Sequence, residues 1–151
     1  DFPERLALES GRPVLVIPYA GRYPHIGRNV VIAWKAGRES ARAVFDALPL
    51  LKGAENVHIL EVRERADEGN MPTPDTSIAT SLARHGIKST IRTSIASDMS
   101  VGDEILSRLA DLDADLLVMG AYGHSRMGEL IFGGATRHIA RHMTAPTLFA
   151  H

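Results

Sequence analysis

The sequence contains no cysteine and few aromatic residues, and both shortages limit what the protein can be. Without cysteine, the 151-residue chain forms no disulfide, thiolate zinc site, cysteine-bound iron–sulfur cluster or thiol nucleophile. Aromatic residues make up 5% of the chain, but 44% of it is apolar, which suffices for one globular core at this length. We therefore expect one domain that folds without cross-links, in keeping with a cytoplasmic location.

Long apolar runs and an excess of one charge are also missing. The longest runs, such as residues 14–17 and 116–119, fall far short of the roughly 18 residues that a membrane-spanning helix needs. The 17 basic and 18 acidic residues nearly cancel, which leaves no net field to attract nucleic acid or an anionic membrane. We expect neither kind of partner.

From residue 29 onward, short apolar strands alternate with amphipathic helical stretches, the pattern of βαβ units and a parallel sheet. The pattern predicts five strands, at residues 30–34, 57–62, 87–95, 116–119 and 146–150. It predicts helices at residues 39–51, 74–85, 101–112 and 128–143, and a mobile loop at 63–71. The predicted architecture is an α/β fold with strand order 3-2-1-4-5 and helices on both faces of the sheet.

Single elements carry further signals. The strand at 87–95 is so polar on one face that it belongs at a sheet edge, whereas 116–119 is apolar throughout, as in a central strand covered on both faces. Ser100 with Asp103 three residues later resembles a capping box at a helix start. Thr73 is predicted to cap the helix that begins at the following proline.

The first twenty residues stand outside this alternation and resemble the end of the chain. At an offset of 133 the residues match in kind: Leu6 with Ile139, Ala7 with Ala140, Pro13 with Pro146, Leu15 with Leu148. We interpret residues 1–20 as the tail of a preceding repeat and 28–151 as a domain, and the absence of an initiator methionine favours this interpretation. The alternative is an ordinary N-terminal extension. In either case residues 14–17 are predicted to form an extra strand beside 147–150.

A glycine-rich segment follows the fourth predicted strand. In an open parallel sheet, ligands bind outside the carboxyl ends of the strands where the strand order reverses, so the loops after residues 34 and 119 should face one crevice. Glycines let backbone N–H groups approach a phosphate, and a helix N-terminus adds a positive dipole. Residues 120–136 therefore predict an anion cradle.

The spacing of Gly120, Gly123 and Gly133 resembles the glycine signature of the universal stress protein family. The resemblance extends over residues 28–151, from Ala33-Trp34 through the glycines to the closing segment at 145–148. It implies an adenine nucleotide alpha hydrolase-like, Rossmann-like fold and a dimer joined through the last strand. It also implies membership of a family that is split between ATP-binding and non-binding proteins.

Carried over to this sequence, the resemblance places Gly120 and Gly123 beside the ribose and phosphates of a nucleotide. The backbone N–H groups of Gly133, Gly134 and Ala135 would bind the phosphates. Gly134 is a departure, because nucleotide-binding relatives usually have serine or threonine there. The same glycines would also suit close packing of helix on sheet, so the two interpretations stay open.

Three further residues are candidates at this site. Thr136 supplies the hydroxyl nearest to the substituted position, and the planar fork of Arg126 suits a phosphate. Lys35 is a second departure, because it stands where relatives have an aspartate that accepts hydrogen bonds from adenosine, and an ammonium accepts none. Lys35 is either a solvated loop residue in a decayed site or a new charge that prefers another anion.

Other polar clusters favour structural roles. His138 and His142 lie one helical turn apart without a glutamate between them, and we interpret them as cations near a helix C-terminus rather than metal ligands. The acidic residues at 111, 113 and 115 lack the glycine and glutamate of a calcium loop and predict a solvated turn. Trp34 and Tyr122 are expected to pack at the crevice wall.

The favoured hypothesis is a non-enzymatic stress-response module with a degenerate or altered nucleotide pocket, no metal and no certain cofactor. It is expected to pair as a homodimer, or with a sister domain, through the last strand. The first alternative is a functional sensor that binds ATP with Mg²⁺ and hydrolyses it slowly. The second is an enzyme for a small anionic substrate that uses Lys35, Arg126 and His124, for which no general base with a positioned partner is evident.

Overall fold

The computed structural model describes residues 2–64, 73–126 and 129–151, with the backbone alone at 124–126 and 129–132. Within those ranges, no helix has both the length and the apolar character needed to cross a lipid bilayer.

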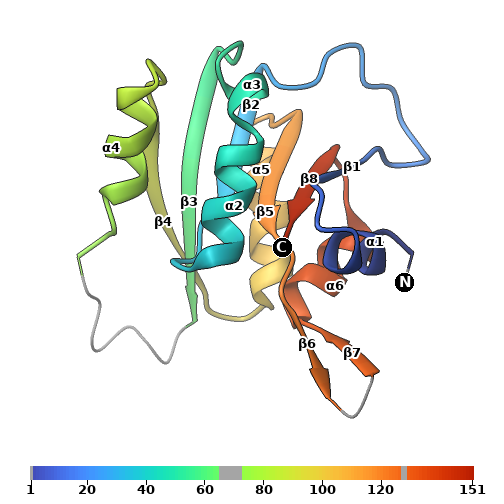
Figure 1. The fold of residues 1–151 in the computed structure, drawn as a ribbon. Helices are drawn as coiled ribbons and strands as arrows, with labels where there is room; N and C mark the ends of the chain where they lie inside the picture. Colours follow the sequence, from blue (N-terminus) through green and yellow to red (C-terminus); the bar gives the residue numbers. More distant parts are fainter. Residues whose placement is uncertain (1, 65–72, 127–128) are drawn as a thin grey trace.

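A six-stranded sheet in the order β1-β8-β5-β2-β3-β4 forms the middle layer (Figure 1). Its strands are β1 (Val14–Val16), β2 (Asn29–Ala33), β3 (Asn56–Glu64), β4 (Thr90–Ala96), β5 (Leu116–Gly120) and β8 (Thr147–Ala150). All neighbouring strands pair in parallel except β1, which runs antiparallel to β8. The five parallel strands therefore have the predicted order 3-2-1-4-5, and β1 is the predicted extra strand.

Helices cover both faces of the sheet. One face carries α2 (Arg38–Asp46), α3 (Leu48–Leu51) and α4 (Ser77–Arg84), and the other carries α1 (Phe2–Glu9), α5 (Val101–Asp111) and α6 (Gly134–His142). Successive residues of a strand point to opposite faces. Accordingly, Val30 and Ile32 of β2 join the core under α2, whereas Val31 joins the core with Ile105 and Ile139.

The sequence signals for strand position are confirmed. Every residue of β5 is buried, as expected for a central strand, and the polar strand β4 lies at the edge. Ser100 caps α5, since its Oγ accepts a hydrogen bond from the backbone N–H of Asp103 at 3.1 Å. These features depend on local periodicity and capping chemistry, which a sequence displays directly.

Several predicted boundaries are wrong. The helix expected at 39–51 is divided into α2 and α3, because Pro49 lacks an N–H and fits only the first turn of a new helix. The cap of α4 is not Thr73: the helix begins at Ser77, whose N–H is bound by the Asp75 carboxylate at 2.9 Å. The strand expected at 87–95 begins at Thr90.

The predicted last helix also begins too early. A two-stranded hairpin of β6 (Gly123–Arg126) and β7 (Glu129–Phe132) occupies its expected first turn, and α6 starts only at Gly134. The apolar residues 130–132 are good strand formers, which favours this outcome. The predicted loop at 63–71 begins later as well, because β3 extends through Glu64, and the remainder of that loop lies outside the described residues.

Candidate functional site

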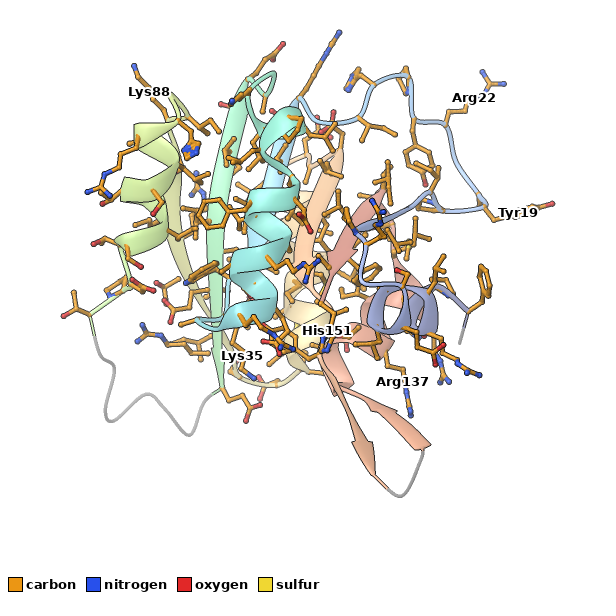
Figure 2. All side chains as sticks on the ribbon, in the orientation of Figure 1. Tyr19, Arg22, Lys35, Lys88, Arg137 and His151 are labelled. Atoms are coloured by element: carbon orange, nitrogen blue, oxygen red, sulfur yellow. The ribbon has the colours of Figure 1, made fainter. Side chains whose placement is uncertain are left out.

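The loops after β2 and β5 leave the sheet from neighbouring strands, as the predicted strand order requires. Ala33 near the end of β2 pairs with Met119 of β5, and the strand order reverses between these two strands. Figure 2 shows Lys35 and His151 at this edge of the sheet. Open α/β sheets bind ligands at such a point, so this crevice is the candidate site.

The Tyr122 side chain bridges the two loops. Its hydroxyl lies 2.6 Å from Oγ of Ser40 and donates to the backbone oxygen of Lys35 at 3.2 Å. Ser40 Oγ in turn accepts from the backbone N–H of Lys35 at 3.2 Å. If the Ser40 hydroxyl donates to the Tyr122 hydroxyl, the three hydrogen bonds form a closed ring. In it the Lys35 N–H, the Ser40 hydroxyl and the Tyr122 hydroxyl each donate once. We call this set the Tyr122 bridge.

Lys35 adds a positive charge to the Tyr122 bridge. Its Nζ lies 5.2 Å from the centroid of the Tyr122 ring, within the range of a cation–π contact. The lysine side chain is exposed, whereas Ser40 beneath it is buried. Burial raises the pKa of the Tyr122 phenol above its usual value, and the nearby Glu39 carboxylate acts in the same direction. The phenol is therefore protonated at neutral pH and can donate its hydrogen bond.

Gly120 allows α2 to pack closely on the end of β5. A Cβ at this position would lie 2.8 Å from the backbone carbon of Glu39 and 2.8 Å from the backbone nitrogen of Ser40. Real side chains do not approach backbone atoms so closely. The structure therefore gives Gly120 a packing role, beside the ligand contact that the sequence suggests.

The start of α6 is tied to Tyr122 through the backbone. The N–H of Gly133 donates to the Tyr122 oxygen at 2.7 Å, and the Tyr122 N–H donates to Oγ1 of Thr136 at 3.0 Å. Thr136 is fully buried. The sequence suggests the Thr136 hydroxyl and the Gly133 N–H as phosphate ligands. In the structure, both are hydrogen-bonded to the backbone of Tyr122 instead.

Gly134 and Ala135 are placed differently. Gly134 is exposed, and a Cβ there would meet open space, while Ala135 is half-buried. The amino end of α6 therefore reaches the surface beyond the Tyr122 bridge. Gly123 begins the β6–β7 hairpin. The side chains of His124 and Arg126, for which the sequence predicts ligand contacts, lie outside those that the structure describes.

Besides Ser40, two residues at the crevice were not identified from the sequence. His151 lies with Nδ1 2.8 Å from the Ala121 oxygen, and Nη2 of Arg38 lies 3.4 Å from its Nε2. In the tautomer that donates from Nδ1, Nε2 accepts from the guanidinium. Both ring nitrogens then have partners. The final residue of the chain is far from 38 and 121 in sequence, so no local pattern could have indicated this contact.

The histidine pair on α6 has a structural partner. Nε2 of His138 lies 2.7 Å from Oδ1 of Asp103, the residue whose N–H is capped by Ser100, and the rings of His138 and His142 lie 4.6 Å apart. This contact joins α6 to the start of α5. In the part of the chain that the structure describes, no three histidine or acidic side chains converge on a possible metal position.

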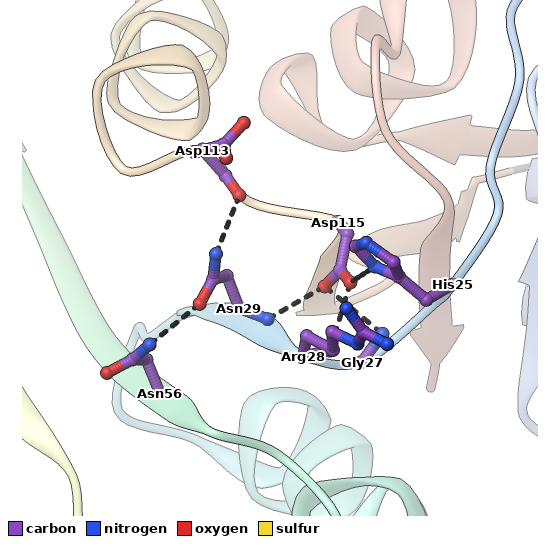
Figure 3. Close-up of polar contacts among 7 residues, drawn as sticks. All are labelled: His25, Gly27, Arg28, Asn29, Asn56, Asp113 and Asp115. Atoms are coloured by element: carbon purple, nitrogen blue, oxygen red, sulfur yellow. Dashed lines mark hydrogen bonds and ion pairs between the residues drawn. The ribbon is translucent and has the colours of Figure 1, made fainter.

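Asp115 has a role that the sequence interpretation missed. At the amino end of the strands its carboxylate accepts from the backbone N–H groups of Gly27, Arg28 and Asn29 at 2.9 to 3.1 Å, and lies 2.7 Å from Nδ1 of His25 (Figure 3). Burial alone would raise the pKa of this carboxyl, but the four hydrogen bonds hold its pKa below the usual value. Asp115 therefore fastens the segment before β2 to the start of β5.

Comparison with known proteins gives a consistent result at the level of the fold. No curated protein matches the chain. A universal stress protein from Archaeoglobus fulgidus superposes with a TM-score of 0.64 at 18% identity, over 83% of this chain and 100% of that chain. A universal stress protein solved in complex with cAMP superposes with a TM-score of 0.58 at 16% identity, over 83% of this chain and 98% of that one.

A second Archaeoglobus fulgidus structure is similar over a longer stretch. It superposes with a TM-score of 0.74 at 18% identity, over 97% of this chain but only 53% of its own length. Identities this low show the shared fold alone. The family itself is shown by the model of the universal stress protein family, which matches residues 27–151. The chain described here therefore belongs to the universal stress protein family.

Proposed function

We propose that this chain is a non-enzymatic universal stress protein module whose nucleotide crevice is closed by its own side chains. The observation that supports the proposal is the Tyr122 bridge, in which Tyr122, Ser40 and Lys35 join the loops on either side of the crevice. A ligand that entered between these loops would have to displace the phenol. It would also have to replace hydrogen bonds that the chain already makes.

The charge at the crevice supports the same proposal. Lys35 stands where the family resemblance places a hydrogen-bond acceptor for adenosine, and its ammonium can only donate. Its position over the Tyr122 ring gives that charge a partner within the chain. The module therefore has weak or altered nucleotide binding, in line with a cytoplasmic protein that works by association.

The histidine at the crevice supports a role without catalysis. A general base needs a free lone pair within reach of a proton on the substrate. With Nδ1 of His151 donating to Ala121 and Nε2 accepting from Arg38, neither nitrogen is free.

A nucleotide sensor is the second candidate function. The related structure that holds cAMP favours it, as does the open space at Gly134 at the amino end of α6. ATP with Mg²⁺ or cAMP would then bind after rotation of Tyr122, with Lys35 and the first turn of α6 facing the phosphates.

The thermal midpoint in the presence of nucleotide separates the two functions. A ligand at 100 times its dissociation constant stabilises a protein by about 2.7 kcal/mol. For the unmodified chain we expect no shift of the midpoint in millimolar ATP with Mg²⁺ or in cAMP. We expect a shift only in Tyr122→Ala combined with Lys35→Asp, which opens the bridge and restores an acceptor.

The matched control is Tyr23→Ala. The Tyr23 hydroxyl also donates to a backbone oxygen, that of Ala20 at 2.7 Å, but it lies in the segment before β2. This variant should respond to nucleotide as the unmodified chain does. A clear upward shift for the unmodified chain would instead make nucleotide sensing the function.

Association is the second part of the proposed function. The edge of β8, through which the resemblance would join two copies, is occupied by β1 of the same chain. This arrangement favours pairing with a sister segment over a homodimer through β8. A shortened chain that starts at Arg28 should therefore form a dimer in light scattering, while the full chain stays monomeric. An unchanged oligomeric state and solubility after truncation would overturn the pairing role of β1.

A further inference from the structure

The first helix and strand repeat the last helix and strand in sequence and in secondary structure. At the sequence offset of 133, the end of α1 at Glu9 corresponds to His142, which is the end of α6. The three residues of β1 correspond to the first three of β8, and Pro13 and Pro146 occupy the same place before the strands. We call these two units α1–β1 and α6–β8.

The two strands pair in a register that has two-fold symmetry. Leu15 pairs with its own counterpart, Leu148. Val14 pairs with Phe149, the counterpart of Val16, and Val16 pairs with Thr147, the counterpart of Val14. This is the reciprocal pattern of an interface between two equivalent units. An unrelated extension has no reason to adopt it.

The two units differ in what covers them. Ile139 of α6 and Leu148 of β8 are buried, with 0% and 6% of their surfaces exposed. Their counterparts Leu6 and Leu15 are 40% and 44% exposed. Among the described residues, five of the seven exposed large apolar side chains lie in this short segment: Phe2, Leu6, Leu15, Ile17 and Tyr19. Figure 2 shows Tyr19 pointing away from the molecule.

The surroundings of α6–β8 indicate what is missing around α1–β1. β8 lies between β1 and the parallel strand β5, and Leu148 belongs to the core that also contains Ala43 and Val44 of α2. Among the described strands, β1 has a neighbour on one side only. Leu15 points to the same face of the sheet as Leu148, since directly paired residues share a face. By the two-fold relation, the free edge of β1 corresponds to the edge of β8 that pairs with β5.

We propose that α1–β1 completes the core of a second universal stress protein domain. That domain is joined to the amino end of α1 in the same way that residue 133 is joined to α6. A strand equivalent to β5 pairs in parallel with the free edge of β1, and a helix equivalent to α2 covers Leu15. A second copy of this chain cannot take that place, because its β5 already pairs with its own β8. The proposal specifies the surface and partner of the associating module proposed above, and it is independent of the crevice.

The longer Archaeoglobus fulgidus structure agrees with this partner. The match covers 97% of this chain, so it must include most of α1–β1. The same match leaves 47% of the longer chain for other structure, which is enough for another core of this size. The fold of this chain, with its helix and strand ahead of the domain, therefore occurs within a chain about twice as long.

The test uses the full chain with its own core, residues 27–133, fused directly ahead of residue 1. In this fusion α1 follows residue 133 as α6 does in the chain itself. We expect a monomer in light scattering, with both cores resistant to trypsin. We also expect the fusion to bind less of an apolar-surface dye than the full chain does.

The decisive variant is Leu15→Lys. In the full chain it should lower the thermal midpoint only slightly, because 44% of the Leu15 surface is exposed there. In the fusion it should shorten the half-life of the added core in trypsin by about tenfold or more and leave a resistant fragment of the size of the full chain. The matched control is Phe45→Lys in the full-chain half, since Phe45 is 45% exposed on α2. This control should leave both cores resistant.

Several results would overturn the proposal. One is removal of the added core by trypsin in the unmodified fusion. Another is an equal half-life of the added core in the Leu15→Lys and Phe45→Lys fusions. A second fusion, with residues 134–149 in place of 1–16, supplies the added core with its own helix and strand. If only this fusion protects the added core, α1–β1 is not a completing unit. If neither does, the two-fold geometry cannot accept a core. A stable dimer of the full chain that Leu15→Lys dissociates would identify a second copy as the occupant instead.

Discussion

The two ends of the parallel sheet are closed by side chains of opposite chemistry. At the amino end, the backbone N–H groups of Gly27, Arg28 and Asn29 converge on the Asp115 carboxylate. At the carboxyl end, the backbone oxygens of Lys35 and Ala121 face the Tyr122 hydroxyl and the His151 ring. Parallel strands expose donors at one end and acceptors at the other, so an acid suits the first end and a phenol or imidazole the second.

The comparison also shows why only one end is a candidate for binding. A partly buried carboxylate with four hydrogen-bond partners is costly to disturb, because charged hydrogen bonds are strong. The Tyr122 bridge consists of neutral hydrogen bonds and one exposed ammonium, which are easier to replace. The amino end therefore fixes the fold, and the carboxyl end is where a ligand could compete.

Asp115→Asn should have the largest effect on stability. The variant loses the charge and places an amide donor opposite backbone donors, so we expect a loss of about 1.5–3 kcal/mol in urea unfolding at pH 7. The matched control is Asp111→Asn, because Asp111 is exposed and pairs with Arg108 on the surface of α5. The control should lose less than about 0.5 kcal/mol. Equal losses in the two variants would remove the distinction between the two ends of the sheet.

The contribution of Asp115 should depend on pH. Its pKa is lowered in the folded state, so the unfolded chain binds the proton at higher pH than the folded chain does. The stabilisation is thus complete above the unfolded pKa of about 3.9 and is lost as the pH falls toward the folded pKa. The difference in unfolding free energy between the unmodified chain and Asp115→Asn should therefore shrink as the pH falls below 4. A difference that grew below pH 4 would contradict this assignment.

Gly120→Ala tests the close approach at the carboxyl end. The added methyl would collide with the backbone of Glu39 and Ser40, which cannot move without shifting the start of α2. We expect a loss of about 1–3 kcal/mol in urea unfolding. Because the shift would displace Ser40, the contact between Ser40 Oγ and the Tyr122 hydroxyl should be lost as well. A neutral effect would show that α2 can slide and that the crevice is less fixed than the structure indicates.

Tyr122→Phe should have a smaller effect. It removes one hydroxyl from the Tyr122 bridge and leaves the ring in place, so we expect a loss of about 0.5–1.5 kcal/mol. Ser40→Ala removes another member of the same ring, and the double variant should lose less than the sum of the two single losses. Additive losses in this double-mutant cycle would mean that the two hydroxyls act independently.

The sequence predicted the sheet order and the cap of α5, but not how the two ends are closed. The complete burial of β5 and the exposure of β4 at the sheet edge are visible in their local composition, and capping by Ser100 reaches only three residues. The contacts of Tyr122 and Asp115 join residues 82 to 90 positions apart, which no local pattern encodes. Asp115 did carry one signal, since an acid directly before a buried parallel strand lies where backbone donors converge. The hairpin of β6 and β7 was missed because its glycines suited a phosphate loop equally well.

The smallest effect is expected at Gly134, on the open side of the crevice. Alanine fits there without contact and reduces the freedom of the unfolded chain, so Gly134→Ala should stabilise the protein by about 0.4–1 kcal/mol. Gly134→Ser adds a hydroxyl at the position where nucleotide-binding relatives usually have one. Thermal midpoints with and without ATP and Mg²⁺ should be unaffected by nucleotide in both variants, since the hydroxyl cannot act while the Tyr122 bridge is closed. A nucleotide response in Gly134→Ser alone would show that a single hydroxyl, rather than the bridge, decides whether this crevice binds.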